Sequence, residues 1–495
     1  MAGSSERRRP SVAVIGGGFG GIAAAVNLRR QGIADITIFE RSAGPGGTWF
    51  DNRYPGAETD APAHLYCFSF APYDWSRTHV RRPELQAYVD HLVSALDLEP
   101  LFRLSTTITR VSWDEAAQGY VLVTAEGEEH RFDAVVSAVG MFSAPHTPHV
   151  PGLDEFGGRT LHTAYWDESV DLTGLRVAVM GTGSSAAQVV PTLAGQARQI
   201  HVFQRQPGWL LPKNDRDLTP LERRLFRLPG VWRANRLRLY LRQERREVAG
   251  AFFRPGTRSN TRARETALAN IADVFADRPD LAEAVTPRYP FGGKRAVLSS
   301  QFYESLVRDD VELVPHAVAA CTATGVVDTT GTEREVDALV LATGFHAAAY
   351  LRTLEVVGRD GLSLHEVWGD EPQAFLGLTV PGFPNFFMLY GPNTNGGLIM
   401  FNLERQAEYA AKEIARLGRT GVTAVEVRAD LTRLYNRWLQ RLIARTAFTS
   451  TDNYFTSATG RVVTQWPDCE TLYALLTLVL RRVSTLGRRT RRSPT

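Results

Sequence analysis

The chain has 495 residues, of which 44% are hydrophobic and 22% charged, and its net charge is +3. This composition is typical of a globular protein with two to four domains, and the charge balance does not indicate a nucleic-acid partner. The three cysteines, Cys67, Cys321 and Cys469, form no CxxC pair, which excludes a dithiol redox centre and a disulfide scaffold.

The N-terminal segment MAGSSERRRP is polar and contains no apolar region of the kind found in signal peptides. No apolar run in the chain is long enough for a transmembrane helix. We therefore expect a cytoplasmic protein without a transmembrane segment.

The first predicted unit, SVAVIGGGFGGIAAAVNLRRQGIADITIFE, has the pattern strand, glycine turn, helix, strand. Gly16, Gly18 and Gly21 form a GxGxxG motif, in which the first glycine makes the turn, the second lets a pyrophosphate approach the backbone, and the third lets helix and strand pack closely. Glu40 follows Gly21 by 19 positions and ends the second strand, where a carboxylate accepts hydrogen bonds from ribose hydroxyls. The unit predicts a site for FAD or NAD.

The segment after Glu40 is rich in turn residues and is followed by a predicted helix, RPELQAYVDHLVSALDL. Alternating apolar residues in TTITRVSWDE and GYVLVTAEGEEHRFDAVVSAVG then predict a β-meander. The proline-rich stretch SAPHTPHVPGL is typical of a linker.

A second strand–turn–helix–strand unit follows, LRVAVMGTGSSAAQVVPTLAGQARQIHVFQR. Its turn consists of Gly181, Thr182, Gly183, Ser184, Ser185 and Ala186, and alanine is an accepted third residue of this motif. Arg205 stands 19 positions after Ala186, where the first unit has Glu40. An arginine pairs with a ribose 2′-phosphate that a carboxylate would repel, so the unit predicts an NADP site. The alternative is that Arg205 is a solvated charge at the end of a strand.

The remaining segments indicate a helical insertion and a return to strands. Residues 216–288 are arginine-rich and helical in pattern, REVDALVLATGF and FPNFFMLYGPNTNGG predict strands that end in turns, and NLERQAEYAAKEIARLG predicts an amphipathic helix. The tail LYALLTLVLRRVSTLGRRTRR has two interpretations: contact with an anionic membrane surface, or a helix packed on the FAD-binding part with a solvated, basic and disordered end. The short apolar run favours the packed helix.

These elements predict an α/β fold with two Rossmann-like dinucleotide-binding domains, one for FAD and one for NADPH, and a helical insertion at about 216–288. We expect residues 1–145 to form the first part of the FAD-binding domain, residues 146–384 the NADP-binding domain, and residues 385–495 the second part of the FAD-binding domain with the basic tail. Two nucleotide sites in one chain imply electron transfer between two cofactors, and no metal site is expected.

Two further stretches carry a family resemblance. GGTWFDNRYPGAETD (46–60) and FGGRTLHTAYWD (156–167), with GTGSS, FQR, YPFGGKR and LATGF in that order, resemble the fingerprints of the Baeyer–Villiger monooxygenases, which are class B flavoprotein monooxygenases. The resemblance covers nearly the whole chain after residue 10. The sequence departs from the family at Asp167, where proline is common.

The resemblance implies an enzyme that uses FAD, NADPH and O2 to insert one oxygen atom next to a ketone carbonyl through a C4a-peroxyflavin, giving an ester or lactone. It further implies that Arg295 is the catalytic cation, that Asp60 positions this arginine, and that Lys294 belongs to the same pair. A guanidinium suits this role because it stays charged and stabilises an oxyanion without protonating it.

The resemblance also implies further cofactor contacts: Gly47, Thr48, Trp49, Asp51, Asp60, Tyr66 and Ile108 for FAD, and Gln206 for NADP. It places His162 in the linker between domains, where it acts in domain movement rather than as a general base. Many relatives have a tryptophan on a loop near the active site, and this chain has Asn453, Tyr454 and Phe455 instead.

Three other functions compete with this interpretation of the sequence. The same cofactors could oxygenate nitrogen or sulfur in a small molecule, although the complete long fingerprint and Arg295 favour the ketone reaction. A disulfide-type reductase would need a CxxC pair, which the chain lacks. A binding-only relative would have lost Arg295 or one glycine turn, and both turns are complete.

Overall fold

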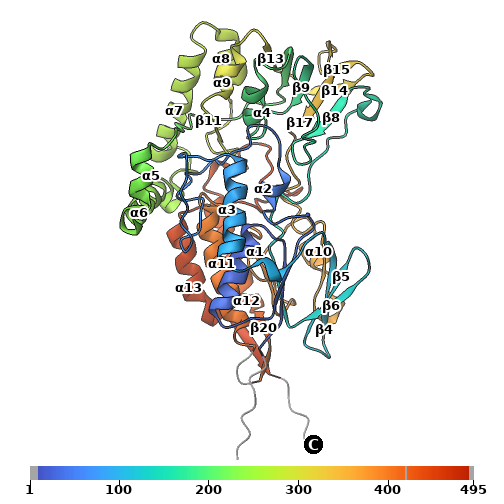
Figure 1. Cartoon of the computed structure of the whole chain (residues 1–495), viewed down its shortest axis with the longest axis vertical. Helices are drawn as coiled ribbons and strands as arrows, with labels where there is room; N and C mark the ends of the chain where they lie inside the picture. Colours follow the sequence, from blue (N-terminus) through green and yellow to red (C-terminus); the bar gives the residue numbers. More distant parts are fainter. Residues whose placement is uncertain (1–8, 418–420, 490–495) are drawn as a thin grey trace, which may run out of the picture.

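The computed structural model describes residues 9–417 and 421–489, and they form two sheet-centred units with helices packed around them (Figure 1). None of the helices in these ranges is both long and apolar enough to cross a membrane. The disorder predicted for the end of the tail concerns residues 490–495, which lie outside the described ranges.

The first unit is built on a five-stranded parallel sheet with the strand order β19-β7-β1-β2-β3. The strands and the first helices of this unit are β1 (Val12–Ile15), α1 (Phe19–Arg30), β2 (Ile36–Phe39), α2 (Thr48–Asp51), α3 (Arg82–Ala95), β3 (Phe102–Arg103), β7 (Ala134–Ser137) and β19 (Phe386–Met388). The strands are continuous runs of buried apolar residues, as expected for a parallel sheet covered on both faces. Because β19 comes from the last third of the chain, the sheet joins segments that are far apart in sequence.

The second unit repeats this arrangement in the order β13-β10-β9-β17-β8, again with parallel pairing throughout. Its elements are β8 (Arg159–His162), β9 (Arg176–Met180), α4 (Ala186–Leu193), β10 (Gln199–Phe203), α9 (Phe302–Leu306), β13 (Val311–Val314) and β17 (Ala338–Leu341). In both units a glycine turn and a helix join the central strand to its neighbour. The predicted α/β fold with two dinucleotide-binding units is therefore confirmed.

The first three strands of the predicted β-meander form a four-stranded sheet with the order β18-β4-β5-β6, in which β18 joins from later in the chain. The last predicted strand of the meander is β7, which belongs to the first parallel sheet instead. The strands of the four-stranded sheet are β4 (Ile108–Asp114), β5 (Gly119–Thr124), β6 (Glu129–Phe132) and β18 (Glu355–Val357), and α10 (Leu364–Trp368) follows. A smaller sheet of β14 (Val318–Cys321), β15 (Gly325–Asp328) and β16 (Glu333–Glu335) belongs to the second unit, and β11 (Leu210–Leu211) pairs with β12 (Val297–Leu298).

The arginine-rich block is helical, as predicted. It contains α5 (Pro220–Phe226), α6 (Pro229–Glu247), α7 (Arg258–Val274) and α8 (Pro279–Val285). Thr219 begins α5 with a capping box, in which its hydroxyl accepts from the Glu222 amide while the Glu222 carboxylate accepts from the Thr219 amide.

The C-terminal part returns to the first unit through α11 (Ile399–Ile414), β20 (Val422–Val427), α12 (Ala429–Ile443), α13 (Glu470–Ser484) and β21 (Thr485–Arg489). α11 packs against both α1 and α13, and the three helices lie in the lower half of Figure 1. Residues 485–489 continue beyond the last helix as a strand that pairs antiparallel with β20. Leu486, Gly487 and Arg488 in this strand are exposed, so the end after the helix is solvated as expected, but it is ordered by its pairing.

Glu413 of α11 fixes this C-terminal hairpin to the helices. Its side chain is fully buried, and its oxygens lie 2.6 Å from Nη1 of Arg481 and 2.7 Å from the Thr485 hydroxyl. Arg416 also pairs with it. A buried carboxylate held by two arginines and a hydroxyl cannot be removed without leaving those donors unpaired.

We expect Glu413→Ala to lower the free energy of unfolding by about 3–5 kcal/mol, because the two arginines lose their buried partner. The matched control is Glu408→Ala on the same helix, whose pairs with Arg405 and Lys412 are about one-third exposed. That change should cost less than about 1 kcal/mol. Urea unfolding of the FAD-loaded protein measures both, and equal losses for the two variants would contradict this account of Glu413.

Candidate active site

The first glycine turn has the geometry that the sequence predicted. Gly16 has φ +109°, and a Cβ there would lie 2.5 Å from the carbonyl oxygen of Ala138 on the neighbouring strand connection. A Cβ on Gly21 would lie 2.1 Å from the carbonyl oxygen of Gly16. Gly18 has more room and lines a cavity, so the backbone is open to a ligand at this position.

That cavity has a volume of about 320 Å³ and runs from the glycine turn past Glu40 to the fingerprint segment. Nine of the residues assigned to cofactor binding line it: Gly16, Gly18, Glu40, Gly47, Thr48, Trp49, Asp51, Tyr66 and Ile108. Gly21 is not among the lining residues, because it packs against the turn. The cavity is lined by glycine backbone, the Glu40 carboxylate and aromatic side chains, which are the groups expected around a dinucleotide such as FAD.

Glu40 is buried and held in place by the backbone. The Gly17 amide donates to Oε2 at 2.6 Å and the Ser42 amide donates to Oε1 at 2.8 Å. Each carboxylate oxygen has a second lone pair, so Glu40 can still accept hydrogen bonds from a ribose diol.

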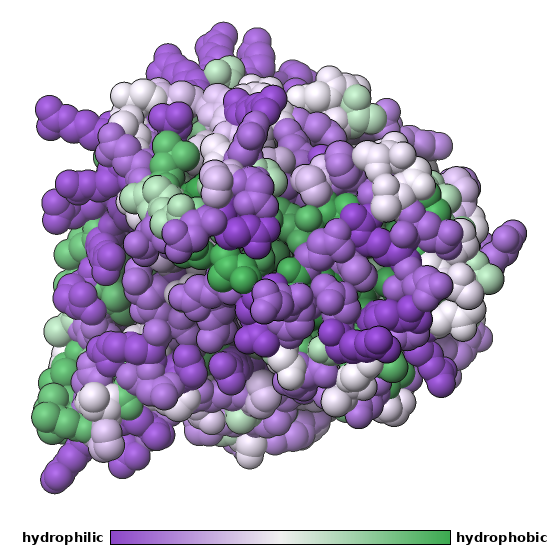
Figure 2. Space-filling model, turned by 90° about the horizontal axis from the view of Figure 1, so that it is seen from above, coloured by the Kyte–Doolittle hydropathy of each residue, from purple (hydrophilic) through white to green (hydrophobic). Residues whose placement is uncertain are grey.

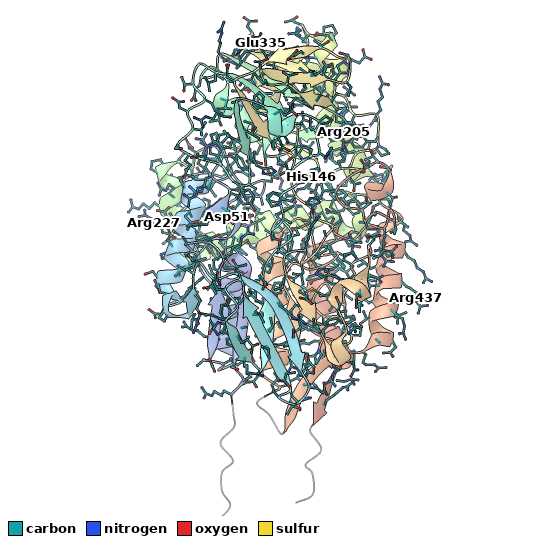
Figure 3. The ribbon with its side chains drawn as sticks, turned by 90° about the vertical axis from the view of Figure 1, so that its right-hand side faces the viewer. Asp51, His146, Arg205, Arg227, Glu335 and Arg437 are labelled. Atoms are coloured by element: carbon teal, nitrogen blue, oxygen red, sulfur yellow. The ribbon has the colours of Figure 1, made fainter. Side chains whose placement is uncertain are left out.

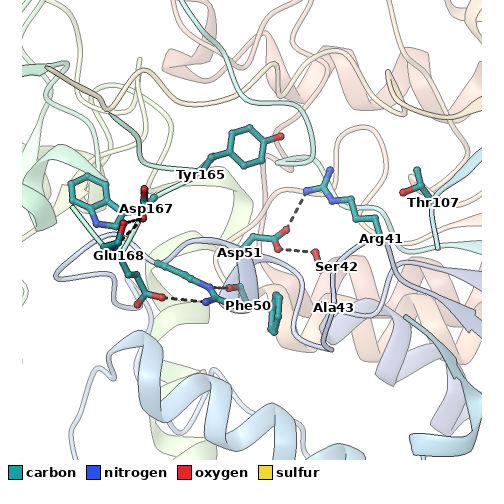
Figure 4. Close-up of a pocket in the computed structure, with 13 residues that line it drawn as sticks. Arg41, Ser42, Ala43, Phe50, Asp51, Thr107, Tyr165, Asp167 and Glu168 are labelled. Atoms are coloured by element: carbon teal, nitrogen blue, oxygen red, sulfur yellow. Dashed lines mark hydrogen bonds and ion pairs between the residues drawn. The ribbon is translucent and has the colours of Figure 1, made fainter. Parts of the chain in front are cut away.

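A second hollow of about 760 Å³ adjoins this cavity, and Figure 4 shows it. Asp51 lies there between Arg41, at 3.2 Å from Nη2, and the hydroxyl of Ser42, at 2.8 Å. Tyr165 of the second fingerprint lines the same hollow. The two fingerprint segments therefore meet beside the adenosine end of the proposed FAD site.

Two aromatic residues of the long fingerprint, Trp49 and Tyr54, contact different units of the protein. Trp49 is 8% exposed, and its indole N–H donates to the Tyr66 hydroxyl at 3.2 Å. Burial raises the pKa of Tyr66 to about 12, so this hydroxyl is neutral at physiological pH. Tyr54 instead leaves the first unit, and its hydroxyl donates to Oε1 of Gln188 on α4 at 2.8 Å.

The second glycine turn repeats the first in detail. Gly181 has φ +110°, and a Cβ there would lie 2.7 Å from the Ala342 carbonyl oxygen. Gly183 has no neighbour within 4 Å of such an atom, so it is open to a ligand. The residues between this glycine and the helix are Ser184 and Ser185, and Ala186 is the buried first residue of α4. Thr182 lies between the two glycines.

Basic side chains gather at the end of β10, next to this turn. The Arg205 side chain is 77% exposed, and its only described ion pair is with the exposed Asp452 at 3.8 Å. Lys294 lies with its ammonium 5.7 Å from the centre of the Tyr289 ring, and burial together with the charge of Arg205 lowers its pKa. Gln206 donates to the Thr451 hydroxyl at 3.3 Å. The two cations fit a nucleotide that carries an additional phosphate.

Figure 3 shows how these groups are distributed. Arg205 lies in the upper unit, whereas Asp51 and His146 lie near the level at which the two units meet. The basic and the acidic nucleotide sites are thus on opposite sides of the boundary between the units.

Arg295 lies where several separate segments come together. Its Nη2 is 3.7 Å from Oδ2 of Asp60, and 42% of its side-chain surface remains exposed. Burial would lower the pKa of Arg295, but Tyr454, Asp60 and Tyr390 hold it above the usual value. The other oxygen of Asp60, Oδ1, is buried without a hydrogen-bond partner among the described residues. The site therefore combines a permanent cation with a polar atom that can accept from a ligand.

Two tyrosines at this site were not predicted as site residues. Tyr454 interacts with Arg295, and burial raises its pKa. Tyr390 has φ +58°, its amide donates to Gln406 at 2.7 Å, and its hydroxyl hydrogen-bonds Asn395. A non-glycine residue in the left-handed region often marks a functional turn, and the sequence signal for this one was the GPNTN segment.

His162 has both ring nitrogens engaged with nearby groups. Nδ1 accepts from the Ala164 amide at 3.0 Å, and Nε2 lies 3.3 Å from the His146 carbonyl oxygen. Burial lowers its pKa. Next to it, the two connections between the units are paired, since the His146 amide donates to Gly344 and the His346 amide donates to Ala144. His162 is the last residue of β8 in the second sheet and lies beside these connections rather than in a linker, and its role in domain movement stays a prediction.

Comparisons with known proteins agree with this geometry. Residues 10–236 match the family described as pyridine nucleotide-disulphide oxidoreductase. The chain is 38% identical over 464 residues to a Baeyer–Villiger monooxygenase of Streptomyces coelicolor, covering 92% of this chain and 88% of that protein. It is also 38% identical over 467 residues to a Baeyer–Villiger monooxygenase of Pseudomonas aeruginosa, covering 93% and 88%.

Solved structures give the same result. Cyclohexanone monooxygenase from Rhodococcus sp. Phi1 bound to NADP+ superposes with a TM-score of 0.88 at 29% identity, over 97% of this chain and 99% of that one. Oxidised steroid monooxygenase bound to NADP superposes with a TM-score of 0.87 at 30% identity, over 97% and 100%.

Fold, cavities and relatives together define a flavin-dependent monooxygenase that uses NADPH. Within that class, the chain belongs to the Baeyer–Villiger monooxygenase family, and its reaction is the oxidation of a ketone to an ester or lactone. The predictions of family, fold, reaction and cofactors are confirmed. The individual site residues remain predictions.

Arg205→Ala should reduce the preference for NADPH over NADH. Losing a charge-assisted pair with the 2′-phosphate costs about 1.5–3 kcal/mol, which corresponds to about tenfold or more in the ratio of the two kcat/KM values. The matched control is Arg198→Ala, an exposed arginine just before β10 and thus at the opposite end of the strand. If Arg205→Ala leaves the NADPH/NADH ratio unchanged, Arg205 is only a solvated strand-end charge.

Proposed function

We propose that Arg295 is the catalytic cation of this Baeyer–Villiger monooxygenase and that Asp60 is its positioning residue. The observation that carries the proposal is the accessible guanidinium of Arg295, 3.7 Å from Asp60 and surrounded by groups that hold its pKa above the usual value. When bound, FAD accepts electrons from NADPH and delivers one oxygen atom of O2 to the substrate.

The chemistry assigned to Arg295 follows from its charge. When an oxygen nucleophile adds to the ketone carbonyl, negative charge develops on the carbonyl oxygen, and a fixed guanidinium stabilises it without giving up a proton. Asp60 forms an ion pair with the arginine through Oδ2, at 3.7 Å, and its other oxygen, Oδ1, has no hydrogen-bond partner among the described residues. Because Tyr66 has a pKa of about 12, its hydroxyl stays neutral and adds no charge to the site.

The proposed cofactor positions follow from the two turns. Residues 1–145 and 385–495 would bind FAD with Gly16, Gly18, Glu40, Gly47, Thr48, Trp49, Asp51, Tyr66 and Ile108 around it and Gly21 behind the turn. Residues 146–384 would bind NADPH with the turn from Gly181 to Ala186, the cations Arg205 and Lys294, and Gln206. The sheet memberships of β19 and β17 fit this division, but the expected boundary at 384 lies too late in the chain. β18 (Glu355–Val357) pairs with β4, and residues from Ala347 onward pack in the core of the first unit, so they belong with residues 1–145.

We propose a small ketone as the substrate. Solved structures of cyclohexanone monooxygenase that resemble this chain include one bound to cyclohexanone, at 28% identity, and one bound to ε-caprolactone, at 29% identity. Tyr454 interacts with Arg295 in this chain and would contribute to the wall of the substrate site, and the buried ring of Phe455 packs behind it.

Arg295→Ala should lower the rate of ester formation by about 10²–10³, because the oxyanion loses its fixed positive partner. Flavin reduction by NADPH creates no oxyanion and should persist, so the consumed NADPH should appear as hydrogen peroxide. Asp60→Asn should give a smaller loss, since the arginine keeps its charge but not its position. Stopped-flow reduction and ester yield measure the two steps separately.

Arg288→Ala is the control, because that arginine lies in the same segment and its side chain is 91% exposed. It should behave like the unmodified enzyme. A variant Arg295→Ala that forms ester at the normal rate would remove this residue from the mechanism. A variant that loses ketone oxidation but retains sulfide oxidation would show that Arg295 serves the ketone reaction alone.

A further inference from the structure

α13 has one packed face and one apolar face that nothing in the described chain covers. The packed face contains Tyr473, Thr477 and Ser484, which are buried. The other face carries Leu475, Leu478, Val479 and Val483, exposed by 51%, 65%, 64% and 56%. Their spacing places them on one stripe of the helix. Single exposed apolar side chains are ordinary, but a continuous stripe of them marks a contact surface.

The neighbouring helix α12 carries a row of cations. Arg433, Arg437 and Arg441 of α12 and Arg445, two residues beyond its end, follow one another at intervals of four, and all four are exposed. None of the ion pairs found in the described ranges uses any of them. Leu434, which is 55% exposed, lies on the same face, and Figure 3 shows Arg437 at the edge of the molecule.

The two helices lie side by side with opposite directions. The Arg428 amide, just before α12, donates to the Ser484 carbonyl at the end of α13 at 2.8 Å. Near the other ends, the rings of Trp438 and Trp466 are 6.4 Å apart, and Trp466 contacts Tyr473 of α13. The apolar stripe and the arginine row therefore belong to one surface, which we call the α12–α13 face.

The apolar part extends onto α6. The Tyr240 hydroxyl hydrogen-bonds the Thr471 hydroxyl at the start of α13 at 2.8 Å, and Leu237 and Leu241 of α6 are 56% and 50% exposed. In Figure 1, α6 and α13 lie on the left side of the molecule, and Figure 2 shows hydrophobic side chains among hydrophilic ones along that edge.

We propose that the α12–α13 face binds the surface of an anionic lipid bilayer. Leucine and valine side chains would enter the boundary between headgroups and acyl chains, and the arginines would pair with lipid phosphates. A second copy of the chain fits this face poorly, because a twofold contact would place the arginine row against itself. The inference concerns a surface away from both nucleotide turns and is independent of the role proposed for Arg295.

The test is co-sedimentation of the FAD-loaded enzyme with vesicles. We expect binding to vesicles that contain phosphatidylglycerol, much weaker binding to vesicles of phosphatidylcholine alone, and weakening of the former as salt is added. Arg437→Glu/Arg441→Glu should weaken binding at least tenfold. Arg159→Glu/Arg198→Glu makes the same change in net charge on the other unit and should leave binding almost unchanged.

The apolar contribution is tested with Leu478→Ser/Val479→Ser, which should also weaken binding at least tenfold. Its control is Leu362→Ser/Val367→Ser, which replaces side chains exposed by 38% and 44% away from this face. All four variants should retain FAD and oxidise NADPH normally, so a loss of binding cannot come from misfolding or from failure of the proposed mechanism.

Three outcomes would overturn the proposal. The first is absence of binding to phosphatidylglycerol vesicles at low salt. The second is an equal loss of binding in the control variants. The third is a dimer in sedimentation velocity that Leu478→Ser/Val479→Ser abolishes while vesicles remain unbound, which would assign the face to self-association.

Discussion

The close approach of backbone to backbone at the two glycine turns is the constraint on which the rest of the molecule depends. Gly16 and Gly181 have nearly the same φ, +109° and +110°, and each lies against a carbonyl oxygen of the next strand connection. Any side chain at either position would collide with that carbonyl. Because the turns stay this tight, helix N-termini are directed at the ligand sites, and the strands that follow end close to them.

The same backbone geometry supports opposite chemistry at the two strand ends. Glu40 is buried and fixed by the amides of Gly17 and Ser42, which suits recognition of uncharged ribose hydroxyls. Arg205 is largely exposed and paired only loosely, which leaves its charge available to an anion. The equivalent position thus carries opposite charge in the two units, whereas the fold around it is repeated.

The parts of this protein that could be predicted from the sequence are those that depend on local spacing. The glycine turns, Glu40 and Arg205 follow from residue separations within one strand–turn–helix–strand unit. Tyr390 and Tyr454 could not be predicted as neighbours of Arg295, because they reach it only after β19 joins the first sheet and the C-terminal loop folds back. Periodicity predicted α13, but it could not show that the stripe from Leu475 to Val483 stays uncovered, because that depends on where α11 and α12 pack.

The connections between the two units, and one segment that contacts both, couple the geometry of the sites. The chain passes between them at two paired crossings, marked by the hydrogen bonds of His146 with Gly344 and of His346 with Ala144, with His162 beside them. Away from these two crossings, the Tyr54 hydroxyl donates a hydrogen bond to Gln188 of α4, the helix that follows the second glycine turn. The long fingerprint therefore contributes Trp49 to the FAD cavity, Tyr54 to the helix of the NADP site and Asp60 to Arg295. A relative movement of the units would therefore change the surroundings of both glycine turns and of Arg295 at once, since one short segment contacts all three.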